Sequence, residues 1–205
     1  TYDADIIFAS EVHQEIRAYK IRGAFNAVND FAENSSKRDV AKGVVTASAG
    51  NHAQGIALSC KELGLKSRIY MPKTTPQQKI DRVRELGDEN TEIILVGNIV
   101  DSSLSAARRD CRDTGAKYIS PFDDELVVAG QGTWGVEIAE SIPNIDMVFC
   151  PVGGMGLIPG ISTAIKSRQP RAKIIGVEPV GAASLKRALE IGHAAAVKEK
   201  IDIFV

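Results

Sequence analysis

The segment Gly43-Val44-Val45-Thr46-Ala47-Ser48-Ala49-Gly50-Asn51-His52 joins an apolar, β-branched stretch to a loop of small and polar residues. β-Branched residues favour a strand. After the loop, apolar residues recur with the spacing of an amphipathic helix, at Ala53, Ile56, Ala57, Cys60 and Leu63. The segment therefore predicts a strand–loop–helix unit, which is the repeating unit of an α/β protein.

The same alternation extends over the rest of the 205 residues. Strands are expected at residues 5–8, 43–47, 68–71, 92–96, 117–120, 147–152 and 173–177. Helices are expected from Lys20 to about residue 34, over 53–63, after Pro76, from a cap at Asp101 to 113, after a loop at 130–133, over 157–168 and over 183–191. Strands that alternate with helices form mainly parallel sheets, so the predicted class is α/β with mainly parallel sheets.

Composition excludes several classes of protein. Apolar residues make up 44% of the chain and charged residues 25%, as in ordinary soluble globular proteins. The formal net charge of −1 gives no electrostatic case for binding nucleic acid or an anionic membrane. Cys60, Cys111 and Cys150 lie far apart, which favours free thiols in a reducing compartment, and the three histidines are too scattered to indicate a metal cluster.

The ends of the chain and its hydropathy give two further expectations. No apolar run approaches the length of a membrane span, and no signal-peptide pattern is present at the N-terminus. The chain starts at Thr1 without a methionine and ends on an apolar run, Ile201-Asp202-Ile203-Phe204-Val205. We therefore expect a fragment that is truncated at both ends.

Lys20 is placed at the start of a helix, above the apolar row formed by Ala24, Ala27 and Phe31. The positive end of the helix dipole and partial burial both disfavour an ammonium group there. A neutral lysine amine is a nucleophile that can form an imine with a carbonyl compound. The alternative is a surface lysine whose stem covers the core while its head lies in water.

Two strand–loop–helix junctions have the composition of anion-binding sites. The loop from Ser48 to His52 offers consecutive amides, a hydroxyl, a carboxamide and an imidazole, which suit a carboxylate. Its alternative role is to cap the following helix. The loop from Gly153 to Leu157 lets backbone amides turn inward around a phosphate. Together with Lys20, these loops suit a phosphate-bearing aldehyde cofactor that acts on an amino acid.

The glycine loop also permits a dinucleotide-binding interpretation. Gly154-Met155-Gly156 follows a strand, and Glu178 ends the next strand, where a dinucleotide fold keeps its ribose-binding acid. Against this, Pro159 stands where the third glycine of that motif belongs. Too little sequence also follows for a second mononucleotide-binding half.

Four motifs resemble the pyridoxal-phosphate enzymes of the threonine dehydratase and serine racemase family, the tryptophan-synthase-β-like fold type II. They are Tyr19-Lys20-Ile21-Arg22-Gly23-Ala24, Ser48-Ala49-Gly50-Asn51-His52-Ala53-Gln54-Gly55, Ala129-Gly130-Gln131-Gly132-Thr133 and Pro151-Val152-Gly153-Gly154-Met155-Gly156-Leu157. Their order and spacing match the family over essentially the whole chain. The resemblance implies two open, twisted, mainly parallel sheets flanked by helices. It also implies a large cofactor domain of residues 1–40 and 129–205 and a small mobile domain of residues 41–128.

The resemblance implies roles for three of these motifs. Lys20 would hold pyridoxal 5'-phosphate covalently, with Tyr19 near the ring and Asn51 at the ring hydroxyl. The phosphate would be bound by Gly153, Gly154, Met155, Gly156 and Leu157. The substrate carboxylate would be bound by Ser48, Ala49, Gly50, Asn51 and His52. The implied reaction is β-elimination of L-threonine or L-serine to a 2-oxo acid and ammonia, as in isoleucine biosynthesis, with Lys20 as the α-proton base.

Departures from the family pattern narrow the choice of reaction. Ala49 replaces the serine that acts as the second base of the racemases, which favours elimination over racemisation. Racemisation and β-replacement remain the related alternatives, and an oxidoreductase or an inactive binding module are the remote alternatives.

Two other departures concern cofactor binding. Met155 replaces one glycine of the usual phosphate loop. The family's partner for the pyridine nitrogen would lie beyond Val205.

The resemblance carries three further expectations. Glu178 and the carbonyl of Ala182 resemble part of a divalent-cation site, although Ser184 stands where a second acid is usual. A homodimer or homotetramer is expected, with a small amino-acid substrate and neither nucleic acid nor membrane as partner. The expected location is the cytoplasm, or an organelle if a transit peptide has been removed.

Overall fold

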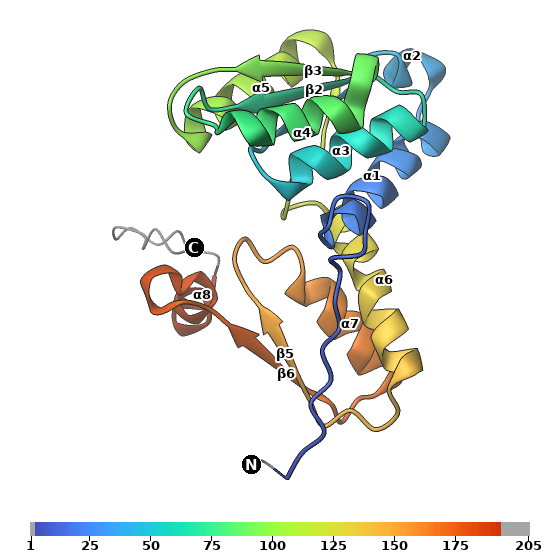
Figure 1. The fold of residues 1–205 in the computed structure, drawn as a ribbon, viewed down its shortest axis with the longest axis vertical. Helices are drawn as coiled ribbons and strands as arrows, with labels where there is room; N and C mark the ends of the chain where they lie inside the picture. Colours follow the sequence, from blue (N-terminus) through green and yellow to red (C-terminus); the bar gives the residue numbers. More distant parts are fainter. Residues whose placement is uncertain (1–2, 194–205) are drawn as a thin grey trace.

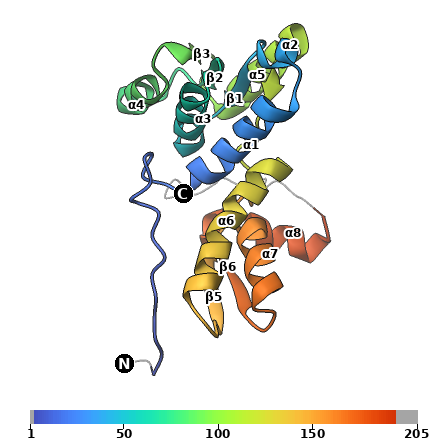
Figure 2. The same ribbon diagram turned by 90° about the vertical axis from the view of Figure 1, so that its right-hand side faces the viewer.

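The computed structural model describes residues 3–193, in which helices alternate with parallel strands (Figures 1 and 2). The α-helices are α1 (Lys20–Asn34), α2 (Lys37–Val40), α3 (Asn51–Glu62), α4 (Gln77–Gly87), α5 (Val100–Thr114), α6 (Glu125–Ser141), α7 (Ile158–Arg168) and α8 (Ser184–Ile191). The strands are β1 (Val44–Ala47), β2 (Ser67–Met71), β3 (Thr91–Leu95), β4 (Lys117–Tyr118), β5 (Met147–Pro151) and β6 (Lys173–Val177). The expected α/β class with two parallel sheets is confirmed.

The first sheet has four parallel strands in the order β3-β2-β1-β4, with Val44 of β1 opposite Ser67 of β2 and Lys117 of β4. All four residues of β1 are buried, because helices cover both of its faces. Val44 packs in one cluster with α1 and α3, whereas Val45 packs on the opposite side with Ala107 of α5. The apolar run that predicted this strand is therefore the centre of a two-sided core.

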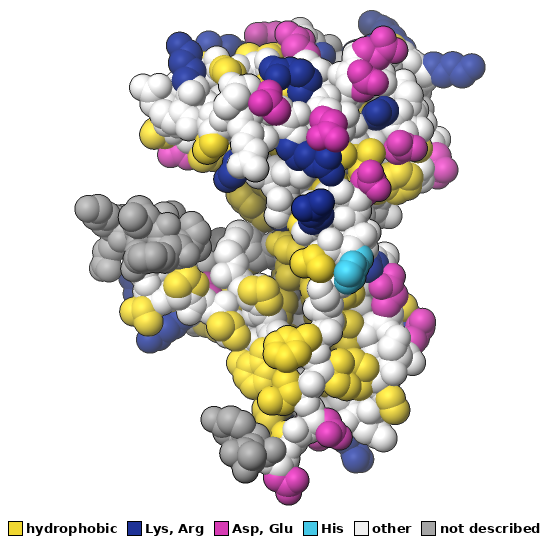
Figure 3. Space-filling view, in the orientation of Figure 1, with side chains coloured by type: hydrophobic (Ala, Val, Ile, Leu, Met, Phe, Trp, Pro, Cys, Tyr) yellow, Lys and Arg dark blue, Asp and Glu magenta, His cyan; other side chains and the backbone are white. Residues whose placement is uncertain are grey.

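The second sheet contains β5 and β6, and α7 covers one of its faces. Cys150 of β5 is buried in a cluster with α7. Side chains alternate along a strand, and the alternate positions Met147 and Phe149 are 52% and 66% exposed. In Figure 3, hydrophobic side chains gather on the lower part of the molecule, where this sheet and the N-terminal segment lie. Within the described residues, this face of the sheet is open.

Helices α1, α6 and α7 connect the two sheets through close contacts between backbones (Figure 1). A Cβ atom added at Gly130 of α6 would lie 2.6 Å from the Cα of Gly23 of α1. A Cβ added at Gly132 would lie 3.2 Å from the carbonyl oxygen of Gly160 of α7. Only glycine allows the helices to approach so closely.

Helix α6 begins earlier than expected. Its cap is Asp124, whose side chain accepts hydrogen bonds from the amides of Leu126 and Val127. The predicted loop at residues 130–133 therefore lies within a helix, and that prediction was wrong. These glycines indicated a loop because glycine usually interrupts a helix, but here they serve the packing against α1 and α7.

Two smaller predictions were also wrong. Residues 5–8 form no strand, and Ile6, Ile7 and Phe8 are 67%, 61% and 89% exposed. No described strand pairs with them, so they belong to neither sheet. Asp101 lies in the first turn of α5 and does not cap it, because Ile99 is at the cap position.

The predicted domain division is untested and stays a prediction. One core cluster contains Ala24 and Val28 of α1 together with Val44 and Ile56, so residues from both predicted domains pack together there. Among the described helices, none is both long and apolar enough to cross a membrane. The expected apolar end of the chain, residues 201–205, lies outside the described residues.

Candidate functional site

The candidate site lies where the strand order of the larger sheet changes direction. From β1 the chain continues to β2 and β3 on one side, and it then returns to β4 on the other side of β1. A crevice opens beyond the carboxyl ends of the strands at such a point, and ligands bind there. The loop from Ser48 to His52 follows β1, and the segment Ser120-Pro121-Phe122 follows β4. Two of the segments that line the site are therefore placed by sheet topology.

Lys20 reaches this edge from the first residue of α1. Its Nζ donates a 2.6 Å hydrogen bond to the carbonyl oxygen of Pro121. The same Nζ lies 5.4 Å from the centre of the Tyr19 ring, which stacks on Trp134 of α6 at 6.3 Å and an interplanar angle of 17°. Lys20 is half-buried, so it differs from the alternative of a surface lysine whose amine lies in water.

Burial lowers the pKa of Lys20 from its ordinary value of 10.5 to about 8. At a pH near 8, half of the amine is therefore neutral and able to attack a carbonyl carbon. Position and protonation together make Lys20 the described lysine most suited to covalent chemistry at this edge.

We expect the reactivity of Lys20 to depend on pH with a midpoint near 8. Below that pH the ammonium form is unreactive, so the rate should rise about tenfold per pH unit and then level off. In the denatured protein, the same rise should continue towards pH 10.5. Labelling with acetic anhydride, followed by mass spectrometry of the Lys20 peptide, measures both curves. Coincident curves would contradict the effect of burial.

His52 is the most deeply buried polar residue of the first loop, at 2% exposed. Its Nε2 lies 3.3 Å from the carbonyl oxygen of Ile119, which also accepts a 2.9 Å bond from Thr46 Oγ1. Burial, followed by the nearby charge of Lys20, lowers the pKa of His52 to about 3. The ring is therefore neutral, and we assign its proton to Nε2 because a carbonyl can only accept. Nδ1 is then a buried acceptor without a partner in the described structure.

The other residues of the first loop lie around the start of α3. Ser48 Oγ accepts the amide of Gly50 at 3.2 Å, and Ala49 and Gly50 are half-buried. Asn51 is the first residue of α3 and is exposed, and no side chain caps this helix. The amides of a first helical turn have no acceptor within the helix. The loop thus offers several donors in one place, as a carboxylate requires.

The glycine loop follows β5 and ends at α7, with Leu157 buried at the cap position. A Cβ atom at Gly153 would meet nothing within 4 Å, whereas one at Gly154 would lie 2.8 Å from the ring of Phe122. Met155 has a φ of 60°, in the left-handed region that favours glycine. The residue that departs from the family pattern therefore has a backbone conformation that glycine adopts readily.

Pro121 brings the glycine loop and Lys20 together. Its carbonyl oxygen accepts the Lys20 amine and also lies 3.1 Å from the position that a Cβ would take on Gly156. The amine, the unpartnered Nδ1 of His52 and the glycine loop with open space at Gly153 thus lie around one edge. These features fit a group that carries both an aldehyde and a phosphate.

Glu178 does not lie free at the end of β6. Its carboxylate accepts hydrogen bonds from the amides of Leu185 and Lys186, at 2.7 and 3.0 Å, and from Ser184 Oγ at 3.1 Å. Burial would raise the pKa of Glu178, but these donors outweigh it, and the pKa is lowered. Glu178 here anchors the start of α8, which leaves few lone pairs for a ribose hydroxyl.

The metal prediction at Glu178 and Ala182 stays untested. Among residues 3–193, no three His, Cys, Asp or Glu side chains are grouped closely enough to hold a metal ion. Ser184, which stands where a second acid was expected, bonds to Glu178 itself.

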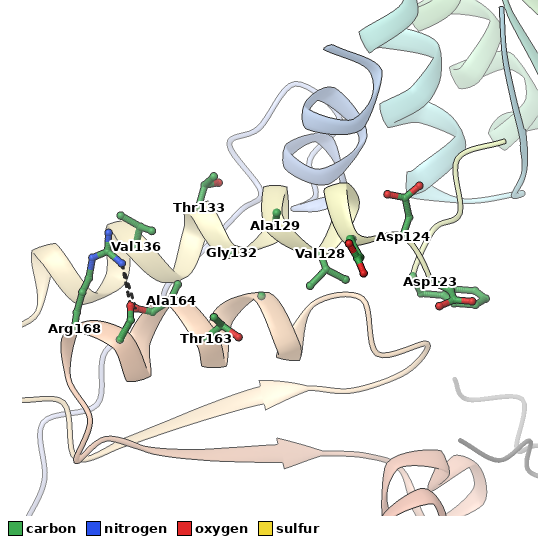
Figure 4. A pocket seen from close by; sticks show the side chains of 14 residues that line it. Asp123, Asp124, Val128, Ala129, Gly132, Thr133, Val136, Thr163, Ala164 and Arg168 are labelled. Carbon is green, nitrogen blue, oxygen red and sulfur yellow. Dashed lines mark hydrogen bonds between the residues drawn. The ribbon is translucent and has the colours of Figure 1, made fainter. Parts of the chain in front are cut away.

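One cavity of the described structure lies mostly away from this edge and shares only Phe122 with it. It has a volume of about 840 Å³ and lies along α6 and α7, where Thr133, Val136, Thr163 and Arg168 line it (Figure 4). None of the predicted site residues lines it. The candidate site is therefore identified by its hydrogen-bond donors and by Lys20, and not by the volume of a cavity.

Several residues at the site were not found from the sequence. Pro121 contacts Lys20 from 101 residues along the chain, Phe122 contacts the glycine loop, and no local pattern indicated either contact. Gln131 is fully buried and its Oε1 accepts the amide of Gly23 at 3.3 Å. A signal did exist for Arg22, because a cation in the first turn of a helix opposes the helix dipole and needs a partner.

Comparison with known proteins gives consistent matches. A family model described as "Pyridoxal-phosphate dependent enzyme" matches residues 1–204. The chain is 46% identical to the biosynthetic L-threonine dehydratase IlvA of Halalkalibacterium halodurans, over 100% of this chain and 48% of that protein. It is 44% identical to an L-threonine ammonia-lyase of Thermotoga maritima, over 96% of this chain and 47% of that protein.

Solved structures show the same likeness. The processed threonine deaminase isoform 2 of Solanum lycopersicum superimposes with a TM-score of 0.85 at 46% identity, over 92% of this chain and 53% of that one. Maize serine racemase superimposes with a TM-score of 0.86 at 33% identity, over 94% of this chain and 56% of that one. The chain thus spans about half the length of the relatives it matches.

Proposed function

The chain belongs to the family of pyridoxal-phosphate dependent enzymes, and from this premise we propose that it takes part in the β-elimination of L-threonine, or of L-serine, to a 2-oxo acid and ammonia. The observation that carries the proposal is the half-buried Lys20 amine, with a pKa lowered to about 8, at an edge shared with two donor-rich loops. The names of the relatives, threonine dehydratase and threonine ammonia-lyase, support the same reaction.

Pyridoxal phosphate, when bound, supplies an aldehyde for a covalent bond and a ring that accepts electrons. Lys20 would hold it, with Tyr19 beside the ring and Asn51 within reach of its hydroxyl. The backbone amides of residues 153–157 would bind the phosphate, and the φ of 60° at Met155 turns that backbone as a glycine would. The stacking of Tyr19 on Trp134 keeps Tyr19 in a fixed place beside the lysine.

The loop of residues 48–52 would bind the substrate carboxylate and so orient the α-carbon. The amides at the start of α3 and the Ser48 hydroxyl are donors, and neutral His52 adds no charge beside the lysine. A bound carboxylate in this place keeps the α-proton on the side of the Lys20 amine. Orientation of this kind contributes a large part of enzymatic rate.

Once the substrate amine has taken its place, the freed Lys20 Nζ would remove the α-proton, since its neutral form is well populated near pH 8. The β-hydroxyl would leave as water with the proton that the lysine took up, and a second water would hydrolyse the product to ammonia and the 2-oxo acid. Ala49 has no group that could return a proton from the opposite face. The chain's own residues therefore favour elimination over racemisation.

We further propose a homodimer or homotetramer in a reducing compartment. The three cysteines are free, and burial raises the pKa of Cys60 to about 12 and of Cys150 to about 11, so both are protonated and inert thiols. The compartment would be the cytoplasm, or an organelle as for the chloroplastic tomato relative.

The proposal is tested by mixing the protein with pyridoxal phosphate and then with L-threonine or L-serine. We expect a coloured protein, with 2-oxobutanoate formed from threonine, pyruvate from serine, and ammonia in equal amount. Formation of D-serine in place of pyruvate would assign racemisation, and a replacement product formed with an added thiol would assign β-replacement. A protein that binds a nicotinamide cofactor but no pyridoxal phosphate would overturn the proposal.

A further inference from the structure

The helix that carries Lys20 lacks the usual features of a helix start. Its cap residue, Tyr19, makes no side-chain hydrogen bond to the first turn, and that turn contains no acidic residue. It contains two cations, Lys20 and Arg22, which the helix dipole disfavours. Contacts from outside the helix must therefore hold this turn in place.

Arg22 makes most of these contacts. Its Nε and Nη2 donate to the carboxylate of Glu11 at 2.7 and 2.9 Å. Its Nη1 and Nη2 donate to the carboxylate of Glu137 of α6, each at 2.7 Å, and Nη1 also donates to Thr133 Oγ1 at 3.1 Å. A guanidinium has five N–H donors in a rigid plane, and these five bonds use all of them. The orientation of Arg22 is therefore fixed.

The centre of this cluster is largely removed from solvent. The side chains of Arg22 and Glu11 are 13% and 9% exposed, whereas Thr133 and Glu137, the latter at 58%, are open to solvent. Bonds to Glu11 and then Glu137 raise the pKa of Arg22, so it stays charged. One residue further on, the amide of Gly23 donates to Gln131 of α6. The N-terminal segment and α6 thus hold the first turn of α1 from two sides.

We propose that Arg22, held between Glu11 and Glu137, is a positioning residue that sets the place of the Lys20 amine. Arg22 lies two residues after Lys20 in the same turn, so a shift of its guanidinium moves the backbone that carries the lysine. The inference rests on the proposed function of Lys20 but gives Arg22 a role that the resemblance did not assign, and it adds Glu11 and Glu137, which lie outside the motifs. It predicts that Arg22 acts through Lys20 and touches neither cofactor nor substrate.

The test compares Arg22→Lys with Arg68→Lys. Lysine keeps the charge but cannot reproduce a planar, bidentate contact. Arg68 provides a matched control because its Nε and Nη2 donate to Asp110 at 2.6 and 2.9 Å, with side chains 22% and 9% exposed. That pair joins β2 to α5, away from Lys20. Both variants should lower the melting temperature by a similar amount.

Two measurements separate positioning from stability. One is the pH profile of acetic anhydride labelling at Lys20, which needs no cofactor. The other is the rate at which pyridoxal phosphate becomes attached to Lys20, trapped by borohydride and measured on the Lys20 peptide. For Arg22→Lys we expect attachment to slow by about tenfold to a hundredfold and the pH midpoint to move from about 8 towards 10.5. Arg68→Lys should match the wild type in both.

The outcomes distinguish this inference from the proposed function. Wild-type values in Arg22→Lys, or equal losses in Arg68→Lys, would overturn the positioning role. A wild-type protein that never attaches pyridoxal phosphate would overturn the proposed function, while a changed labelling profile in Arg22→Lys would still support positioning. If Arg22→Lys does not fold, Glu137→Gln serves instead, because Glu137 is exposed and the substitution removes charge with little change of shape.

Discussion

Substitution of Lys20 by methionine is expected to abolish both covalent attachment of pyridoxal phosphate and production of 2-oxobutanoate. Methionine fills a similar space but has no amine. The variant loses the proposed nucleophile for the cofactor and the proposed base for the α-proton, and a general base alone contributes about a hundredfold to ten-thousandfold in rate. The measurements are the visible absorbance of the protein with pyridoxal phosphate and the rate of 2-oxo acid formation.

Lys166→Met is the matched control for this substitution. Lys166 Nζ donates a 2.6 Å bond to the carbonyl oxygen of Pro170, as Lys20 Nζ does to that of Pro121, but Lys166 is exposed at the end of α7. We expect the control to keep its colour and its rate. A Lys20→Met protein that is still coloured after dialysis and still forms 2-oxobutanoate would rule out Lys20 as both tether and base.

Lys20→Met should leave the fold intact, and the direction of its effect on stability follows from the pKa of Lys20. The pKa of Lys20 falls from 10.5 in the unfolded chain to about 8 in the folded one. Between these values the unfolded state binds more protons, so stability rises as the pH increases from about 8 to 10.5, and below 8 the folded state bears the burial of a cation. At pH 7 the free energy of unfolding of Lys20→Met should not fall below that of the wild type. Loss of activity with retained stability would show that Lys20 serves chemistry and not folding.

Local patterns predicted those parts of the molecule that local physics decides. β1 and α3 were predicted from Val44–Ala47 and the apolar row after His52, because a β-branched run and the 3.6-residue period are properties of neighbouring residues. The glycine loop was predicted for the same reason, since glycine widens the range of backbone conformations that a short segment can adopt. Two of the four motifs of the family resemblance lie in these segments.

Contacts between distant residues could not be predicted in this way. The bond from Lys20 to Pro121 joins positions 101 residues apart, and that from Arg22 to Glu137 joins positions 115 apart. Helix α6 shows how a distant contact also hides a local element. Gly130 and Gly132 indicated a loop, yet each is a glycine because another helix backbone lies against it. Gln131 and Thr133, which bond to the first turn of α1, therefore lie in a segment whose structure was predicted wrongly.

Gly23→Ala is expected to be among the most destabilising single substitutions in the described part of the chain. A Cβ at this position would lie 2.5 Å from the carbonyl oxygen of Val127 and 2.9 Å from Cδ of the buried Gln131. Backbone atoms cannot give way as a flexible side chain can, so α1 must move away from α6. Overpacking of this kind costs about 1–3 kcal/mol, and we expect the upper end of that range. Urea denaturation measures the loss.

Gly23→Ala should also displace Lys20, because Gly23 follows it by three residues on α1 and α1 must move away from α6. Gly153→Ala is the control for stability, since a Cβ there meets nothing within 4 Å, and a change in the free energy of unfolding within about 0.5 kcal/mol is expected.

A double-mutant cycle that combines Gly23→Ala with Gln131→Ala adds a sharper measurement. Removing the Gln131 side chain relieves one of the two close contacts but not that with Val127, so the double variant should be less destabilised than the sum of the single ones. Strict additivity, or a Gly23→Ala protein as stable as the wild type, would show that α1 and α6 are not held at the spacing that places the Lys20 amine beside Pro121.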